Sequence, residues 1–176
     1  MKTFIAFSGS LRKNSFNTNL LKAAQELAPE GSTIEIVDIS TFPLFNQDEE
    51  GNYPPQVKAI KDKVVAADGV IFATPEYNRS IPGVLKNAID WISRPYGTNP
   101  FARKPTLVMS ASGGGISGAL ANYHLKQVMN YLDADILGQP EFFLSGAMNK
   151  FDESGKLTDE DTKTHIKKAL EVLASR

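Results

Sequence analysis

The 176-residue sequence contains no cysteine. Disulfide bonds and a catalytic thiolate are therefore excluded, and the absence fits a reducing compartment such as the cytoplasm. An excess of either charge is also lacking, because 19 basic and 20 acidic residues leave a net charge of −1. Without a basic field the chain is not expected to bind nucleic acid. The two histidines, His124 and His165, have no neighbouring carboxylate cluster, so a surface or interface role is expected rather than a metal site.

Long hydrophobic runs are absent as well. No apolar segment approaches the ~20 residues that a membrane helix needs, so no membrane contact is expected. The first apolar run ends after Phe7, which is too short for a secretory signal and predicts a first strand of a cytoplasmic protein. A hydrophobic content of 41% is typical of globular chains. At about 150 residues per domain, we expect residues 1–176 to form one domain.

Strand-like and helix-like segments alternate along the chain. Apolar or alternating runs predict strands over residues 3–8, 33–38, 68–74 and 106–110. Residues 134–143 are expected to contain a fifth strand, whose limits Gly138 and Pro140 blur. Apolar positions at helical spacing predict helices over residues 20–27, 57–67, 84–91, 125–132 and 166–173. This order predicts an α/β fold of the flavodoxin-like type, a three-layer sandwich whose five-stranded parallel sheet has the order 2-1-3-4-5. Ligands of such sheets bind outside the carboxyl ends of the strands.

Some smaller features also lead to expectations. Thr158 and Asp161 resemble a capping box that opens the last helix. Trp91 is expected to pack its own helix rather than to stack on a substrate. The acidic residues 48–50 are expected to form a solvated turn.

The first predicted loop, residues 9–18, enters a helix N-terminus. Unpaired N–H groups and a partial positive charge at such a position suit a phosphate. Arg12 can add a charge-assisted hydrogen bond. Short side chains add further donors, namely those of Ser10, Ser15, Asn17 and Thr18. The loop lacks the G-x-x-x-x-G-K-[ST] pattern of a Walker A motif. An ordinary helix cap would account for any one of these residues, but the run as a whole favours phosphate binding.

The second loop, residues 74–83, contains two prolines that stiffen its backbone. Tyr77 offers an aromatic surface, and Asn78 offers both a donor and an acceptor. A flat heterocycle with a polar edge is a plausible ligand for such a loop. The alternative is a rigid surface turn whose tyrosine packs on its own protein. Glu76 is expected to be structural or solvated rather than a catalytic base.

The third loop, residues 110–118, formally satisfies G-x-G-x-x-G over residues 113–118, with Asp133 and Asp135 about 20 residues further on. That dinucleotide fingerprint normally belongs to the first βα turn, so an NAD site of the Rossmann type is the weaker interpretation. Three consecutive glycines more simply permit the backbone to approach a ligand closely. Ser112 is expected to donate to a ligand that the other two loops hold. No G-x-S-x-G or H-E-x-x-H motif is present, so a hydrolase is not indicated.

At these loops the sequence resembles the NAD(P)H-dependent FMN reductase family of flavodoxin-like proteins, and within it the chromate/quinone reductase branch. Three stretches carry the resemblance: GSLRKNSFN at Gly9–Asn17, TPEYNRSIPGVLKNAIDWISR at Thr74–Arg94, and SASGGGISG with YHLKQ within Ser110–Gln127. The first two motifs are specific to the family and the third is looser. Some relatives carry an Arg and a Gln just after the glycine loop, where this chain has SGAL at 117–120.

The resemblance implies FMN as the cofactor and NADPH or NADH as the co-substrate. The first loop would hold the FMN phosphate and ribityl chain, the second would line the isoalloxazine, and the third would complete the pocket. The expected cofactor residues are Ser10, Arg12, Ser15, Phe16, Asn17 and Thr18, then Pro75, Glu76, Tyr77 and Asn78, and finally Ser112, Gly113 and Gly115. No protein residue is expected to be catalytic, because the chemistry takes place at N5 of the flavin.

We therefore expect an FMN-dependent oxidoreductase in which a nicotinamide passes hydride to the flavin and then leaves. A small acceptor, such as a quinone, a free flavin, an azo dye or a metal oxyanion, would then take the electrons. The resemblance also implies a homodimer or homotetramer, with contacts from the helix that carries Tyr123, His124 and Gln127. The alternative is a flavin-binding electron carrier without its own NAD(P)H reaction. The near-neutral charge weakly disfavours a carrier.

Overall fold

The computed structural model describes all 176 residues. Its strands are β1 (Lys2–Ser8), β2 (Ser32–Val37), β3 (Gly69–Thr74), β4 (Pro105–Ala111), β5 (Asp135–Ile136) and β6 (Phe142–Leu144). Its α-helices are α1 (Phe16–Glu26), α2 (Pro55–Ala66), α3 (Gly83–Ile92), α4 (Ala119–Tyr131) and α5 (Glu160–Ala174). Two single turns of 3-10 helix, η1 (Gln47–Glu49) and η2 (Ala147–Asn149), lie in loops. No helix combines the length and the hydropathy that crossing a bilayer requires.

All strand pairs are parallel, and the order β2-β1-β3-β4-β5 confirms the predicted arrangement. Residues 134–143 contain the expected fifth strand, β5, but the predicted count of five strands is wrong. The segment forms two short strands, β5 and β6, and both pair with β4, so the sheet has six strands. Gly138 and Pro140 lie between them, and a proline has no N–H group to continue a strand ladder.

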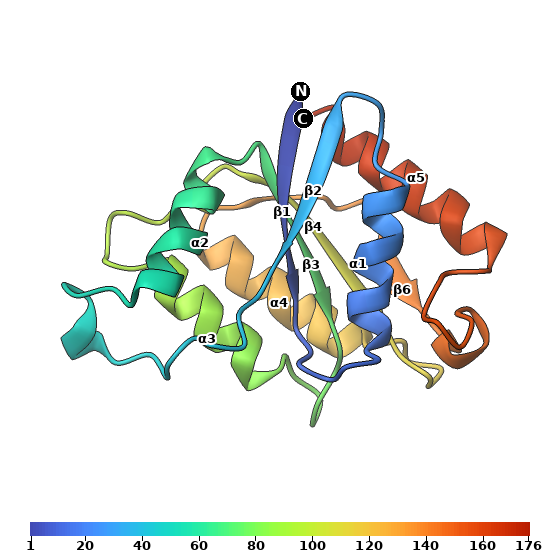
Figure 1. Cartoon of the computed structure of the whole chain (residues 1–176), viewed down its shortest axis with the longest axis horizontal. Coiled ribbons are helices and arrows are strands. Elements are labelled where there is room, and N and C mark those ends of the chain that lie inside the picture. The colour runs from blue at the N-terminus through green and yellow to red at the C-terminus, as the bar shows by residue number, and fades with distance from the viewer.

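Helices cover both faces of the sheet and make three layers (Figure 1). Helices α1 and α5 lie on one face, and α2, α3 and α4 lie on the other. Successive residues of β1 serve opposite cores: Phe4 and Ala6 pack toward α1 and α5, while Ile5 and Phe7 pack toward α2, α3 and α4. Burial on both faces explains why this strand is an unbroken apolar run.

Helix starts agree with the sequence only in part. Ser15 caps α1, since its hydroxyl accepts hydrogen bonds from the backbone N–H groups of Asn17 and Thr18. The predicted cap of α5 by Thr158 is wrong by one residue, because the carboxylate of Asp159 accepts from the N–H of Thr162. An aspartate is an equally good cap, and local sequence does not decide between two adjacent candidates.

Trp91 of α3 is 1% exposed, and its indole nitrogen donates to the carbonyl oxygen of Pro43 at 2.8 Å. The predicted packing role of this side chain is confirmed.

Candidate functional site

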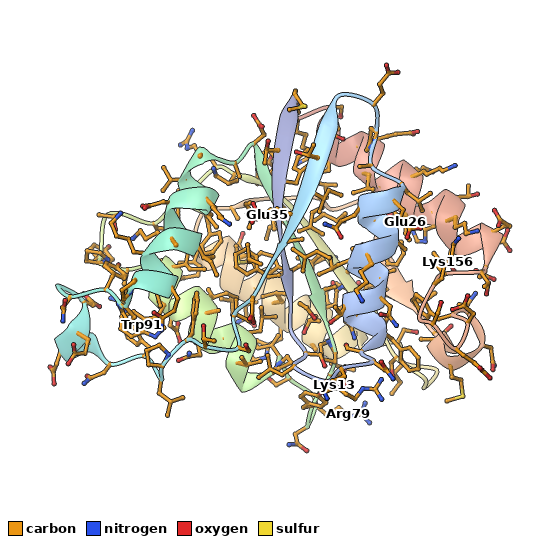
Figure 2. The ribbon with its side chains drawn as sticks, in the orientation of Figure 1. Lys13, Glu26, Glu35, Arg79, Trp91 and Lys156 are labelled. Atoms are coloured by element: carbon orange, nitrogen blue, oxygen red, sulfur yellow. The ribbon has the colours of Figure 1, made fainter.

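The loops that follow β1, β3 and β4 meet at one edge of the sheet, as the fold class predicts. Figure 2 labels Lys13 and Arg79 from the first two of these loops at that edge. The N–H of Gly9 donates to the carbonyl oxygen of Ala73 at 2.8 Å, which joins the first loop to the end of β3. The side chain of Asn17 exchanges two hydrogen bonds of 2.9 Å with the backbone of Ala111, which joins α1 to the end of β4.

Several backbone donors in the first loop have no partner within the protein. They are the N–H groups of Leu11, Lys13, Asn14 and Phe16. These groups lie at the N-terminus of α1, where the helix dipole adds a partial positive charge. Arg12 is exposed, and its guanidinium lies 5.3 Å from the ring centroid of Phe16. This set of donors suits a phosphate group.

The short side chains of the same loop are already engaged. Ser15 caps α1, Asn17 bonds to Ala111, and the hydroxyl of Thr18 lies 2.7 Å from that of Ser8. The hydroxyl of Ser10 accepts from the N–H of Arg12 at 3.3 Å. These side chains shape the loop, and its open donors are backbone N–H groups and the Arg12 guanidinium.

The second loop contains a tight hairpin at residues 77–80, with two residues at its turn. Tyr77 and Ser80 exchange two backbone hydrogen bonds of 3.1 and 3.0 Å. The two central residues, Asn78 and Arg79, have φ values of 50° and 64°, as a type I′ turn requires. Tyr77 is 52% exposed, so about half of the residue is covered by its own protein and the rest is open to solvent. Its aromatic surface therefore remains open at the edge of the site.

Glu76 connects this loop to α4. Its Oε2 accepts hydrogen bonds from the N–H groups of Leu120 at 3.1 Å and Ala121 at 3.2 Å, and its Oε1 pairs with Arg79 at 3.1 Å. The N-cap residue of α4 is Gly118, which has no side chain to satisfy these donors. Glu76 supplies the missing cap from another loop, and its predicted structural role is confirmed.

The third loop carries the glycines of the formal dinucleotide pattern. Gly118 is the glycine that the structure requires, because its φ is 74° and a Cβ there would lie 3.1 Å from Cβ of Ser110. Gly115 has open space around it, while a Cβ at Gly113 would meet the flexible side chain of Met148. The loop follows β4, whereas the dinucleotide fingerprint of a Rossmann site follows the first strand. Its position therefore disfavours an NAD site of the Rossmann type.

The segment after β6 also borders this edge, and sequence reasoning missed it. The ring of Phe151 stacks on that of Phe16 with centroids 6.0 Å apart, and the N–H of Ala147 donates to the carbonyl oxygen of Ser112 at 3.0 Å. The rule that ligands bind at carboxyl ends of strands could have found this segment. It was missed because only one strand was predicted within residues 134–143, so no carboxyl end was expected after Leu144.

The largest cavity, about 700 Å³, lies away from the first loop, between α3 and α4. We call it the α3–α4 groove. Two tyrosines at its rim, Tyr96 and Tyr131, are 87% and 82% exposed. Its walls carry both signs of charge, with Lys86 and Arg94 opposite in sign to Asp90 and Asp133.

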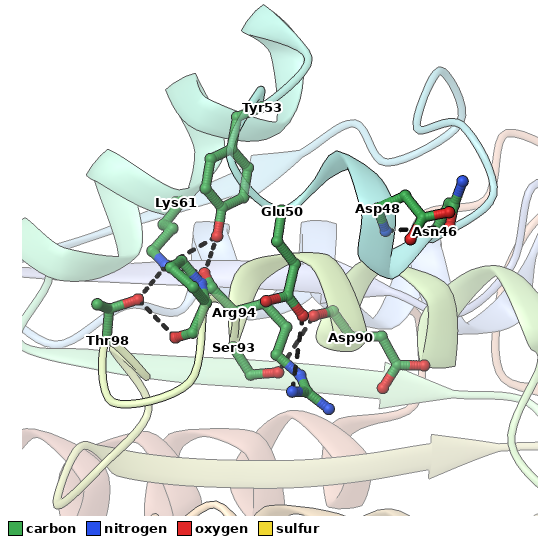
Figure 3. A network of polar contacts seen from close by, with 10 residues as sticks. Asn46, Asp48, Glu50, Tyr53, Lys61, Asp90, Ser93, Arg94 and Thr98 are labelled. Carbon is green, nitrogen blue, oxygen red and sulfur yellow. Dashed lines mark hydrogen bonds and ion pairs between the residues drawn. The ribbon is translucent and has the colours of Figure 1, made fainter.

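A polar network holds one end of this groove (Figure 3). Lys61 and Tyr53 both donate to the backbone carbonyl of Arg94, and Lys61 also donates to Thr98 at 2.9 Å. Burial lowers the pKa of Lys61, and burial together with Glu50 raises the pKa of Tyr53. The expectation that Glu50 lies in a solvated turn is wrong, because its carboxylate lies 3.6 Å from the guanidinium of Arg94 and its side chain is 18% exposed.

A parallel sheet in this order, with anion-ready donors after its first strand, defines the flavodoxin-like class of α/β proteins. The family model of NADPH-dependent FMN reductases matches residues 2–149. An NAD(P)H-dependent FMN reductase of Pseudomonas aeruginosa is 45% identical over 170 residues, which cover 96% of this chain and 91% of that protein. An NADPH:quinone oxidoreductase of Arabidopsis thaliana is 48% identical over 172 residues, covering 94% and 86%.

The solved structure of the flavoenzyme FerB, an NAD(P)H:(acceptor) oxidoreductase from Paracoccus denitrificans, superposes with a TM-score of 0.91 at 35% identity. The match covers 99% of this chain and 96% of that one. The chain belongs to the NADPH-dependent FMN reductase family. It is an oxidoreductase with FMN as cofactor and NAD(P)H as reductant, as the resemblance implied.

Proposed function

We propose that this protein reduces small quinone-type acceptors with electrons from NAD(P)H, through FMN held at the edge where the first, second and third loops meet. The observation that carries the proposal is the set of unpaired backbone N–H groups beside Arg12 at the start of α1. The relatives named as quinone oxidoreductases support the choice of acceptor.

The residues at this edge fit FMN. The phosphate would accept hydrogen bonds from the free N–H groups of Lys13 and Asn14 and from the Arg12 guanidinium. The isoalloxazine would lie against the hairpin, whose two positive-φ residues fix the directions of its backbone N–H and C=O groups. The open face of Tyr77 and the backbone around Ser112 would border the ring.

When bound, FMN would supply the redox chemistry between the nicotinamide and the acceptor. The protein residues bind and orient. Pro75 and Pro82 stiffen the second loop, so little ordering cost is added when a flat ring binds. The side chain of Tyr77 leaves the mouth open, which suits a nicotinamide and an acceptor that use one site in turn.

Absorption spectroscopy tests this proposal directly. Apo-protein mixed with FMN is expected to quench flavin fluorescence and to take on the flavin absorption bands. Addition of NADH or NADPH should then bleach those bands, and a quinone should restore them. Bound flavin that neither nicotinamide bleaches would support the electron carrier instead. A protein that takes up no FMN would contradict both interpretations.

We also propose that a second copy of the chain binds in the α3–α4 groove and makes a homodimer. Exposed tyrosines at the rim, Tyr96 and Tyr131, are typical of protein interfaces. The walls carry charges of both signs that are already paired within the chain, such as Lys86 with Asp90 at 2.7 Å, so two copies can meet across a two-fold axis without a like-charge patch facing itself. Sedimentation velocity should give about twice the monomer mass, and Tyr131→Asp should return a monomer. A wild-type protein that remains monomeric would contradict this assignment.

A cytoplasmic location remains an expectation from the sequence.

A further inference from the structure

The hairpin at residues 77–80 holds Arg79 in a backbone conformation that glycine, asparagine and aspartate adopt far more readily than arginine. Asn78 and Arg79 both have positive φ, in the left-handed region that L-residues rarely adopt. Consecutive residues of this kind persist where the surrounding structure holds them. The hairpin is exposed to solvent at Tyr77, Asn78 and Arg79, so its conformation depends on a few specific contacts.

Those contacts connect both ends of the hairpin to the first turns of α4. Before the hairpin, Glu76 accepts hydrogen bonds from the N–H groups of Leu120 and Ala121. At its end, Oγ of Ser80 lies 2.8 Å from Nδ1 of His124. Residues 120 and 124 are neighbours on one helix face, one turn apart. Helix α4 therefore holds the hairpin from two points.

We propose that His124 is a positioning residue of the flavin site. Its hydrogen bond to Ser80 fixes the end of the hairpin, and the hairpin in turn presents its backbone to the isoalloxazine. The inference rests on the proposed FMN site but concerns a residue outside it. Glu76 provides the other anchor, so loss of His124 loosens the hairpin without unfolding it.

Two pairs of substitutions separate this hydrogen bond from simple packing. Ser80→Ala and His124→Gln each remove the bond, the latter because a glutamine amide lies at the position of Nε2 rather than at that of Nδ1. His124→Asn keeps a polar group near that position and is the conservative variant. Gln127→Ala is the matched control, since Gln127 lines the same groove on α4 as His124 but makes no hydrogen bond to the hairpin.

The first measurement is amide hydrogen exchange in the FMN-free protein. Exchange at the N–H groups of Tyr77 and Ser80 should quicken several-fold in Ser80→Ala and His124→Gln, and should stay at the wild-type rate in His124→Asn and Gln127→Ala. The second measurement is FMN affinity, which should weaken about three- to ten-fold in the first two variants, as expected for one lost neutral hydrogen bond. At saturating FMN, NADH should bleach the flavin more slowly in the same two variants.

Two results would overturn the proposal. One is unchanged exchange and FMN affinity in both Ser80→Ala and His124→Gln. The other is damage in His124→Asn equal to that in His124→Gln, which would assign the effect to packing. Ser80 is a partly exposed loop residue, so Ser80→Ala is expected to fold. It therefore tests the hydrogen bond even if a substitution in helix α4 folds poorly. The exchange measurement needs no cofactor. If the wild-type protein bound no FMN, the proposed function would be contradicted, but the exchange rates would still show whether His124 holds the hairpin.

Discussion

The N-termini of α1 and α5 are built in opposite ways. Helix α1 starts with the neutral cap Ser15 and has no acidic residue in its first turn. Helix α5 starts with the carboxylate of Asp159, and Glu160 and Asp161 follow in its first turn. Lys150 lies 2.8 Å from the same carboxylate and completes an ion pair there.

The difference bears on what each helix end can do. The positive end of the α5 dipole is already neutralised by carboxylates of the chain. The end of α1 keeps unpaired N–H groups and an exposed arginine, so it is suited to an anion that comes from outside. Helix α4 is intermediate, because Glu76 reaches its first turn from another loop. The comparison indicates that α1, rather than α5, is the helix end fitted to a phosphate.

Removal of the arginine at the α1 end is expected to have the largest effect. Arg12→Ala should weaken FMN binding roughly 10- to 150-fold, about 1.5–3 kcal/mol, because a charged hydrogen bond to phosphate is lost. The free energy of unfolding should not change, since the side chain is exposed. Fluorescence titration with FMN measures the first quantity and urea unfolding the second. Arg12→Lys keeps the charge and should lose less affinity. Equal affinity in wild type and Arg12→Ala would remove Arg12 from the site.

A carboxylate placed at the α1 end should make it behave like α5. Asn14 is exposed and immediately precedes the cap Ser15, so Asn14→Asp changes charge with little change in shape. FMN affinity should fall about five-fold, or about 1 kcal/mol, because the new charge repels the phosphate and competes for the N–H groups. Stability of the FMN-free protein should hold or rise by a few tenths of a kcal/mol. The loss of affinity should shrink at high salt. A variant with unchanged affinity would show that this helix end does not contact the phosphate.

The sequence predicted those parts of the fold that depend on local patterns. Buried strands such as β1 and β3 are continuous apolar runs, and their order follows from the alternation of strands and helices. The division of β5 from β6 was missed, because Gly138 and Pro140 blur a pattern that is only a few residues long on either side.

The site was predictable only as a meeting place of loops. The shared carboxyl edge of the strands follows from topology, so the three loops could be grouped in advance. The contacts that join them could not be predicted. Asn17 bonds to Ala111, 94 residues away, and Glu76 caps a helix 44 residues further on. Such contacts depend on the tertiary arrangement and leave no periodic signal in the sequence.

The pH dependence of stability tests whether the N-terminus of α5 depends on the charge of its cap, Asp159. The hydrogen bond from Lys150, followed by those from Thr162, lowers the pKa of Asp159 from 3.8 to about 2. A folded-state pKa below the unfolded value means that the stabilisation is present above about pH 4 and is lost as pH falls from about 4 to 2. Asp159→Asn keeps an N-cap side chain but removes the charge. At pH 7 the variant should be less stable by about 0.5–1 kcal/mol, a modest value because the Asp159 side chain is 29% exposed.

Urea unfolding of wild type and Asp159→Asn, measured in parallel between pH 7 and pH 2, gives the difference in unfolding free energy. Other carboxylates titrate in both proteins, so their contributions cancel in that difference. The difference should shrink as pH falls from about 4 and should approach zero only near pH 2. A difference that stays constant over the whole range would show that the carboxylate stabilises α5 through its shape alone. The N-terminus of α5 would then not need the negative charge of Asp159, and charge would not explain the difference between α5 and α1.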